Sequence, residues 1–212
     1  MRIILLGVPG AGKGTQAEIL SKRLSIPTIS TGNVLRAAIK AETPLGLEVK
    51  DILARGELVS DEIILEIMRD RVLEADCQNG YILDGVPRTV AQAEGLEDLG
   101  VKIDTCLLLE VPDELVVDRL SGRRACPNCG NNFHVTANPP QKADVCDHCA
   151  TGLLIRPDDE ASTVERRLLV FREQTAPLID FYQTRGKLKT VSNLGSVEEV
   201  SQAVFHALGV ES

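Results

Sequence analysis

A glycine-rich segment with a single lysine carries the strongest chemical signal in the sequence. It reads Gly-Val-Pro-Gly-Ala-Gly-Lys-Gly-Thr over residues 7–15, directly after the apolar run Arg2–Leu6. Glycines let backbone N–H groups point inward around an anion, and the lysine meets the β- and γ-phosphates of a nucleotide. The alternative is a glycine-rich surface turn, which the strand–loop–helix context disfavours. The segment therefore predicts a phosphate-binding loop (P-loop) formed by Gly10, Ala11, Gly12, Lys13, Gly14 and Thr15.

An acidic residue ends a second apolar run and is a candidate ligand for a metal ion. Asp84 follows Ile82 and Leu83, and an aspartate in that place holds Mg²⁺ in P-loop proteins, often through water. Gly14 stands where Ser or Thr usually supplies a hydroxyl ligand, and Thr15 follows, so that ligand is weakened or shifted. Alone, Asp84 would equally fit a turn or a cap. Beside a P-loop, it favours Mg²⁺.

Four of the six cysteines form two Cys-x2-Cys pairs separated by sixteen residues. This spacing is close to that of zinc sites in which four thiolates complete a tetrahedron. Iron is an alternative because it accepts the same sulfur ligands, whereas two disulfides or free thiols are disfavoured in a reducing compartment. The two lone cysteines, Cys77 and Cys106, are expected to be buried apolar side chains. The pattern predicts a closed structural metal site made by Cys126, Cys129, Cys146 and Cys149.

These motifs need a scaffold in which strands and helices alternate. Short apolar runs typical of strands buried on both faces of a parallel sheet lie at Arg2–Leu6 and at residues 80–83, 105–109 and 188–191. Helix start signals lie at Ser60-Asp61-Glu62 and at two capping boxes, Ser162-x-x-Glu165 and Ser196-x-x-Glu199. The alternation predicts a doubly wound α/β domain whose ligands bind at the carboxyl ends of the strands.

One stretch, residues 122–159, interrupts this alternation. It has little periodicity and contains four prolines and all four paired cysteines. It lies between two predicted helices, Asp113–Ser121 and residues 162–185. A loop of that length without structure of its own is uncommon, so the stretch predicts a small subdomain held by its metal.

Length, composition and charge limit the class of protein. The 212 residues are 43% hydrophobic, which suffices for a core, and 31 acidic against 23 basic residues give a net charge of −8. Such a balance disfavours binding to nucleic acid or to an anionic membrane. No apolar run approaches the roughly 20 residues that span a bilayer. We therefore expect a cytoplasmic protein with no nucleic-acid or membrane partner.

Two further motifs complete a resemblance to a known family. Ser30-Thr31-Gly32-Asn33-Val34-Leu35-Arg36 and Gly85-Val86-Pro87-Arg88, together with the P-loop, closely resemble adenylate kinase along the whole chain. The resemblance implies reversible, Mg²⁺-dependent phosphoryl transfer from ATP to AMP, giving two ADP, by a monomer. It implies a P-loop core with a parallel five-stranded sheet flanked by helices (residues 1–29, 60–121 and 160–212). It also implies a small helical AMP-binding segment (residues 30–59) and a mobile lid (residues 122–159) that carries zinc.

The resemblance also implies roles for individual residues. The P-loop residues would hold the phosphates of ATP, and Asn132, Phe133 and Gly195 would lie against its ribose and adenine. AMP would be held by Thr31, Arg36, Gly85, Val86, Pro87, Arg88 and Gln92, by the backbone of Glu57, Leu58 and Val59, which would line its adenine, and by Arg156 and Arg167. Arg119 would face the phosphates of ATP. The transferred phosphoryl group would be stabilised by Lys13, Asp84, Arg88, Arg123, Arg156 and Arg167.

Three departures and several alternatives accompany these roles. Gly195 has no side chain, so only its backbone could contact ATP. Asn33 replaces the usual Asp, and Val86 replaces the usual Phe of Asp-Gly-Phe-Pro-Arg. Gln92 could close a capping box with Thr89, Thr31 could cap a helix, and arginines on helices are often merely solvated. Alternative functions are a kinase for UMP or GMP, or a zinc-ribbon nucleic-acid-binding protein with an NTPase core. The charges of residues 122–159 form no basic face, which disfavours the latter.

Overall fold

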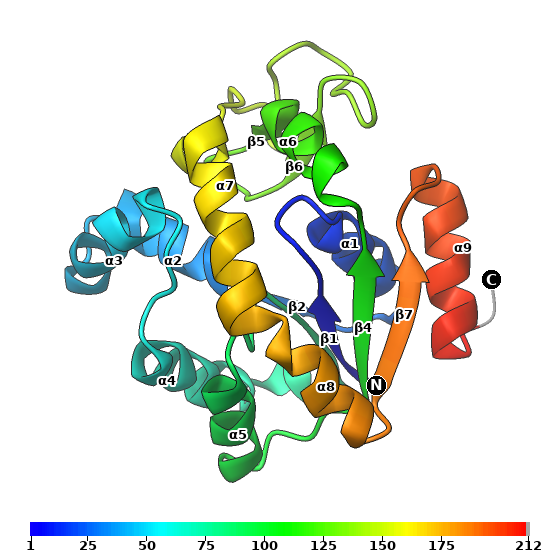
Figure 1. Ribbon diagram of the computed structural model, residues 1–212. Coiled ribbons are helices and arrows are strands. Elements are labelled where there is room, and N and C mark those ends of the chain that lie inside the picture. The colour runs from blue at the N-terminus through cyan, green and yellow to red at the C-terminus, as the bar shows by residue number, and fades with distance from the viewer. Residues whose placement is uncertain (211–212) are drawn as a thin grey trace.

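A parallel five-stranded sheet lies at the centre of the molecule, in the strand order β2-β3-β1-β4-β7. The computed structural model describes residues 1–210. The strands are β1 (Arg2–Leu6), β2 (Thr28–Ser30), β3 (Tyr81–Asp84), β4 (Thr105–Glu110) and β7 (Leu188–Ser192). The predicted α/β fold with a parallel five-stranded sheet flanked by helices is confirmed (Figure 1).

Helices cover both faces of this sheet and extend beyond one edge of it (Figure 1). Those described are α1 (Lys13–Leu24), α2 (Thr31–Lys40), α3 (Pro44–Ala54), α4 (Asp61–Arg71), α5 (Val90–Asp98), α6 (Asp113–Ser121), α7 (Ala161–Val170), α8 (Pro177–Thr184) and α9 (Val197–Leu208). In this part of the chain, no helix has the length and apolar character needed to cross a membrane.

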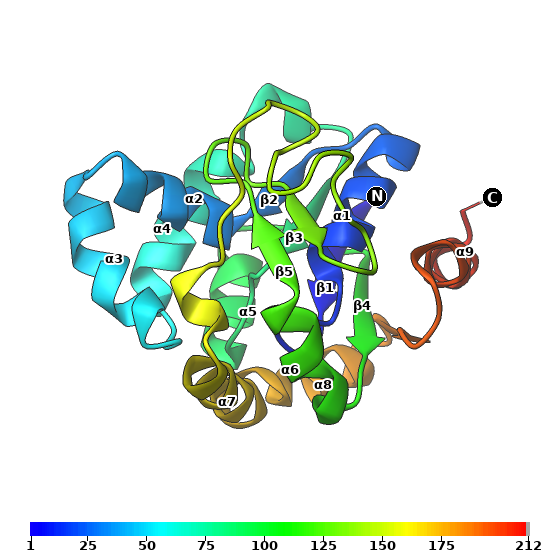
Figure 2. The ribbon, with the colours of Figure 1, turned by 90° about the horizontal axis from the view of Figure 1, so that it is seen from above.

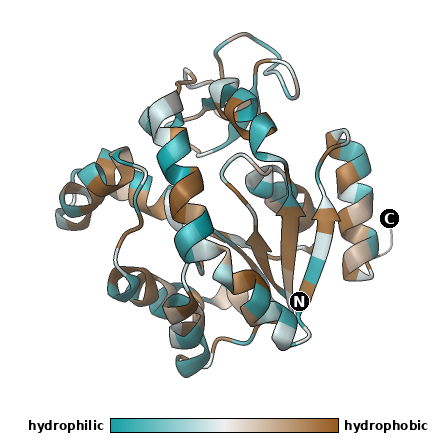
Figure 3. Cartoon of the chain, in the orientation of Figure 1, coloured by the Kyte–Doolittle hydropathy of each residue, from teal (hydrophilic) through white to brown (hydrophobic). Residues whose placement is uncertain are grey.

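The strands are apolar without alternation because both of their faces are buried. Ile3 and Leu5 of β1 belong to one apolar cluster, which also includes residues of α1 and α9. Ile4 and Leu6 belong to a second cluster on the opposite face, with residues of α4, α5 and α8. Figure 3 shows β1 and β4 as hydrophobic along their length. Successive side chains of a strand point to opposite faces, which explains this division.

Because the strands are parallel, their carboxyl ends share one edge, and the loops that follow them meet there. Leu5 of β1 pairs with Asp84 of β3, so the P-loop begins beside that carboxylate. The ends of β1, β4 and β7 point toward the segment that carries β5 (Arg123–Ala125) and β6 (Asn132–His134) (Figure 1). Seen from above, this segment lies over that edge of the sheet (Figure 2).

The segment of residues 122–159 has structure of its own. Strands β5 and β6 pair antiparallel, and backbone bridges join Ala125 to Leu154 and Val145 to Gly152. Its small apolar cluster consists of Cys126, Phe133 and Cys146, with Cys149 and Leu153 packed against it. A cluster of this size is too small to serve as a core, which is consistent with stabilisation by a metal ion.

The helix signals are confirmed in part. Ser60 and Ser196 cap α4 and α9, and the Ser196 box is complete. The box predicted at Ser162 is wrong: α7 begins one residue earlier, after Glu160, without a side-chain cap. The single helix predicted over residues 162–185 is also wrong, because a π-helical segment, Phe171–Thr175, separates α7 from α8.

Candidate active site

The P-loop joins β1 to α1 and presents the amino terminus of that helix to the edge of the sheet. Gly12 is the N-cap residue in a left-handed conformation (φ 81°), and no side chain caps the helix. The first N–H groups of α1 are therefore not used by a capping side chain, as an anion-binding helix end requires. Lys13 is the first residue of α1, and its Nζ donates to the carbonyls of Gly7 (2.7 Å) and Val8 (2.9 Å).

Asn193, which was not predicted from the sequence, directly follows β7 and holds this loop in place. Its Nδ2 donates to the carbonyl of Ala11 (2.6 Å), and its own carbonyl accepts from Arg119 (2.7 Å). A Cβ at Gly12 would come within 2.6 Å of the same Nδ2. Glycine at position 12 is therefore required both by the backbone conformation and by this close approach.

Cations gather around the P-loop in excess of carboxylates. The side chains here are close enough to affect one another's pKa. The positive ones are Lys13, Arg36, Arg88, Arg123, Arg156 and Arg167, and the negative ones are Asp84, Asp158 and Asp159. Burial lowers the pKa of Lys13 to about 8, against the opposing effect of Asp84. Burial likewise lowers the pKa of Arg36 to about 10. In a chain of net charge −8, this concentration of positive charge is typical of a site for a polyanion.

Two acidic residues at the base of the 122–159 segment hold two of these arginines. Arg123 makes two hydrogen bonds to the fully buried carboxylate of Asp159. Arg167 of α7 contacts Asp158 at 2.9 Å and Asp159 at 3.1 Å. Although burial opposes it, the positive charges of Arg167 and Arg123 lower the pKa of Asp158. The acid pair therefore fixes both guanidinium groups and joins the segment to α7.

Arg156 is the least satisfied of the cations. It is 7% exposed, its Nε has no hydrogen-bond partner among the described residues, and one terminal nitrogen donates to Asn132 Oδ1 (2.5 Å). Burial, together with nearby Arg123 and Arg36, lowers its pKa to about 9. A buried donor without a partner is costly, and a phosphate oxygen would satisfy it.

The residues expected to hold AMP meet around the loop after β3. The carbonyl of Gly85 accepts from Thr31 Oγ1 and from Arg88 Nε, both at 3.0 Å. The side chain of Gln92 accepts from the backbone N–H of Arg88 at 2.7 Å. Gln92 therefore closes no capping box, although Thr89 does cap α5. Thr31 is not a cap either, because Ser30 occupies that position.

The remaining residues of this group lie on the borders of the site. Glu57, Leu58 and Val59 connect α3 to α4, and Val59 is buried. Val86 is buried in the main apolar cluster, followed by a cis bond to Pro87. The side chain of Arg36 donates to Asn33 Oδ1 at 2.7 Å. Their contacts with AMP stay predictions.

The residues expected to contact the ribose and adenine of ATP are less closely grouped. Asn132 approaches the P-loop, since a Cβ at Gly14 would lie 3.8 Å from its Nδ2 and 3.9 Å from Asp84 Oδ2. Phe133 is buried in the apolar cluster of the 122–159 segment. Gly195 lies between β7 and α9, directly before Ser196. Their roles therefore stay predictions. The side chain of Phe133 packs against Cys126 and Cys146 in this structure.

The four paired cysteines converge as their spacing predicts. The sulfur atoms of Cys126, Cys129, Cys146 and Cys149 all lie within 4.8 Å of one another. The Cys126–Cys149 and Cys129–Cys146 sulfur distances are 3.4 and 3.5 Å, near the ~3.8 Å edge of a tetrahedron with metal–sulfur bonds of about 2.3 Å. The donor set therefore fits a tetrahedral, thiophilic ion. Cys77 and Cys106 are buried, as expected.

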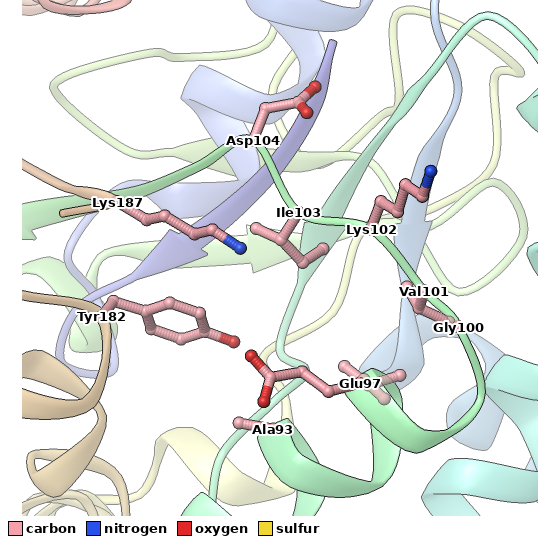
Figure 4. Close-up of a pocket in the computed structure, with 10 residues that line it drawn as sticks. Ala93, Glu97, Gly100, Val101, Lys102, Ile103, Asp104, Tyr182 and Lys187 are labelled. Atoms are coloured by element: carbon pink, nitrogen blue, oxygen red, sulfur yellow. The ribbon is translucent and has the colours of Figure 1, made fainter. Parts of the chain in front are cut away.

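A separate cavity of about 450 Å³ lies at the opposite edge of the sheet. It is lined by residues of α5, of α8 and of the segments that precede β4 and β7. Figure 4 shows the hydroxyl of Tyr182 and the carboxylate of Glu97 pointing toward one another across it. It contains none of the cations described above and is distinct from the P-loop site.

Comparison with known proteins agrees with this arrangement. The profile of the family described as "Adenylate kinase" matches residues 5–187. Over its full length the chain is 54% identical to all of a protein named adenylate kinase from Caldicellulosiruptor bescii. It is 49% identical to proteins of the same name from Ruminiclostridium cellulolyticum, over 99% of this chain and 100% of that protein, and from Trichlorobacter lovleyi, over 98% and 99%.

Proposed function

This chain belongs to the adenylate kinase family, and from that premise we propose that it catalyses reversible, Mg²⁺-dependent transfer of a phosphoryl group from ATP to AMP, giving two ADP. It is a nucleoside monophosphate kinase by family. The observation that carries the proposal is the cluster of cations around the P-loop, of which Arg156 is buried and the others are partly buried. These cations outnumber the carboxylates near them. Two phosphate-bearing substrates that meet there would supply the missing negative charge.

Binding of the donor is assigned to the P-loop and its neighbours. The N–H groups at the start of α1 and the Lys13 ammonium would hold the phosphates of ATP, so that Lys13 exchanges its two carbonyl partners for phosphate oxygens. Arg119, held by Asn193, would complete this side. Asp84 offers the hard oxygen ligand that Mg²⁺ prefers, and the ion would neutralise charge on the phosphate oxygens.

Binding of the acceptor is assigned to the loop after β3 and to α2. Arg36 and Arg88 would hold the phosphate of AMP, with Thr31 and Gly85 fixing the position of Arg88. The attacking atom is a phosphate oxygen that is already ionised, so no general base is needed. Positioning and charge neutralisation account for the rate.

The 122–159 segment would act as a lid. It brings Arg123 and Arg156 to the site, and it lies over the carboxyl edge of the sheet (Figure 2). It also contacts the AMP-binding segment, because Lys40 Nζ donates to the carbonyl of Pro127 at 3.2 Å. Closure excludes water, which would otherwise accept the phosphoryl group. The four thiolates would hold zinc, or iron as the alternative, in a purely structural site.

A coupled assay of ADP formation, with ATP and each nucleoside monophosphate in turn, tests the proposal. We expect AMP to be the preferred acceptor, with activity lost when Mg²⁺ is chelated. A preference for UMP or GMP would instead support the alternative kinases. We further propose that the enzyme is a monomer in the cytoplasm, where a reducing environment keeps the four cysteines available as ligands. We also propose that it binds neither nucleic acid nor membranes, because its net charge is −8.

A further inference from the structure

An acidic side chain outside the cation cluster, that of Asp61, holds the side chain of Gln92, which is expected to bind AMP. Asp61, in the first turn of α4, accepts two hydrogen bonds on Oδ1. One comes from the Gln92 Nε2 amide at 2.8 Å, and the other comes from the Thr89 hydroxyl at 3.0 Å. Thr89 Oγ1 in turn accepts from the Gln92 backbone N–H at 3.0 Å. The result is a closed ring of hydrogen bonds that joins the start of α4 to the start of α5.

This ring fixes which end of the Gln92 amide faces which neighbour. The backbone N–H of Arg88 can only donate, so the atom 2.7 Å from it is the amide oxygen. The Asp61 carboxylate can only accept when ionised, so the atom facing it is the amide nitrogen. A flipped Gln92 would set donor against donor at Arg88 and oxygen against oxygen at Asp61. Both contacts would be lost.

A fixed amide distinguishes two kinds of purine. Each amide atom keeps one hydrogen-bonding capacity after these contacts, one N–H and one oxygen lone pair. Adenine offers a donor at its 6-amino group and an acceptor at N1, whereas a 6-oxopurine offers an acceptor at O6 and a donor at N1. The two bases thus present donor and acceptor in opposite order, so a Gln92 amide that is free to flip could pair with both bases. An amide held in a single orientation can pair with only one of the two bases.

Resting on the proposed function of Gln92 in AMP binding, we propose that Asp61 is a positioning residue that makes the site select a 6-aminopurine monophosphate over a 6-oxopurine one. Asp61 touches no substrate in this scheme and acts through Gln92. Its place in the chain supports the role, because it follows Val59 by two residues. Asp61 thus lies close in the chain to the Glu57–Val59 segment expected to line the adenine, and it contacts the Gln92 amide, which in this proposal faces the edge of the base.

The test compares kcat/KM for AMP and for inosine monophosphate, a 6-oxopurine, with ATP as donor. Asp61→Ala should lower the AMP-to-inosine-monophosphate ratio roughly tenfold, mainly through a higher KM for AMP, because one charge-assisted hydrogen bond no longer opposes the flip. The KM for ATP should not change. Asp61→Asn keeps an acceptor oxygen and should keep the ratio within about threefold of wild type.

A matched control separates this role from a contribution to helix stability. Glu62 is the other acid in the first turn of α4 and is exposed, so Glu62→Ala removes the same charge from the helix terminus without touching Gln92. Its ratio should equal that of wild type. Should Asp61→Ala fail to fold, Asp61→Ser keeps a polar side chain that is too short to reach the amide.

The outcomes are distinct. An unchanged ratio in folded Asp61→Ala or Asp61→Ser, or an equal change in Glu62→Ala, overturns the inference. If Gln92→Ala leaves the AMP-to-inosine-monophosphate ratio unchanged, the inference is also overturned. The proposed function still stands in that case, provided that the wild-type enzyme phosphorylates AMP. A wild-type enzyme that does not phosphorylate AMP removes the proposed function, and this inference with it.

Discussion

At the scale of single residues, the P-loop lysine is the group whose removal should matter most. Lys13 is partly buried as the first residue of α1 and is close to other cations, and in the proposed mechanism its ammonium meets the phosphates of ATP. Lys13→Ala should therefore lose most of the phosphotransfer activity. The fold should survive, because the residue's hydrogen bonds are only to carbonyls of its own loop. Near-wild-type turnover with a normal circular dichroism spectrum would contradict the assignment.

The same lysine should make ATP binding dependent on pH. Its pKa in the ligand-free protein is lowered to about 8, chiefly by burial, so the ammonium is present below that pH and is lost above it. While ATP is fully ionised, its affinity should be highest below pH 8 and fall above it, by up to about tenfold per pH unit, because binding then requires uptake of a proton. Calorimetric titration of wild type and Lys13→Ala checks this. A decline of equal size in Lys13→Ala would exclude Lys13 as its source.

Residues of the site differ in how far the sequence could predict them. Lys13, Asp84 and the four clustered cysteines lie within short motifs, where spacing alone determines what they can bind. Asn193 and Asp61 lie outside such motifs. Asn193 acts on Ala11, 182 residues away, and Asp61 acts on Gln92, 31 residues away. No local pattern encodes such pairings, since they depend on which helix and strand ends the folded chain brings together.

At the scale of secondary-structure elements, the Asp158–Asp159 pair joins the proposed lid to α7. Asp159→Asn should lower the free energy of unfolding of the ligand-free enzyme by about 3 kcal/mol, because it leaves the Arg123 and Arg167 charges buried without a full partner. The loss should be smaller with ATP and AMP bound, since phosphates then supply negative charge. Urea unfolding with and without both nucleotides measures this difference. An equal loss in both states would mean that the phosphates do not reach these arginines.

Helices and strands could be predicted where their apolar positions follow a regular pattern, and less well where the pattern is short or continues across a break. The strand Arg2–Leu6 and the helix Asp113–Ser121 have the predicted bounds. The pattern of apolar runs did not reveal β2, because three residues are too few to establish a period. The break at Phe171–Thr175 was also missed. The apolar positions of that stretch continue through the π-helical segment, and Pro177 follows it as the first residue of α8, where proline is tolerated.

At the scale of the whole molecule, two regions with different kinds of stability contribute to one site. The sheet and its helices have two large apolar clusters. The 122–159 segment has only a small one, in which two of the cysteines take part. Its link to the rest is polar: Lys40 to the Pro127 carbonyl, and Arg123 and Arg167 to Asp159. We therefore propose that this segment depends on a metal ion for its order, and that its contacts with the core can break without unfolding that core.

This division predicts what removal of the metal should do. In the proposed site, four thiolates would complete the coordination shell and leave no position for water or substrate, so we expect the ion to take no part in phosphoryl transfer. Metal binding free energy adds to folding free energy when the unfolded chain releases the ion. Chelation, or the double change Cys129→Ser and Cys146→Ser, should therefore lower the unfolding temperature by much more than it lowers activity at moderate temperature.

The measurement requires a temperature at which the metal-free protein is still folded. Elemental analysis of the purified protein should first return about one ion per chain, as the single four-cysteine cluster among residues 1–210 implies. Cys106→Ser is a matched control, because it alters a buried thiol that lies in β4, outside the lid, and should leave metal content unchanged. At a temperature where circular dichroism shows the chelated enzyme folded, phosphotransfer should persist, since Lys13 and Arg88 belong to the core and the lid needs only to close. Complete loss of activity there, restored only by metal, would show that the ion sets the positions of Arg123 and Arg156 directly.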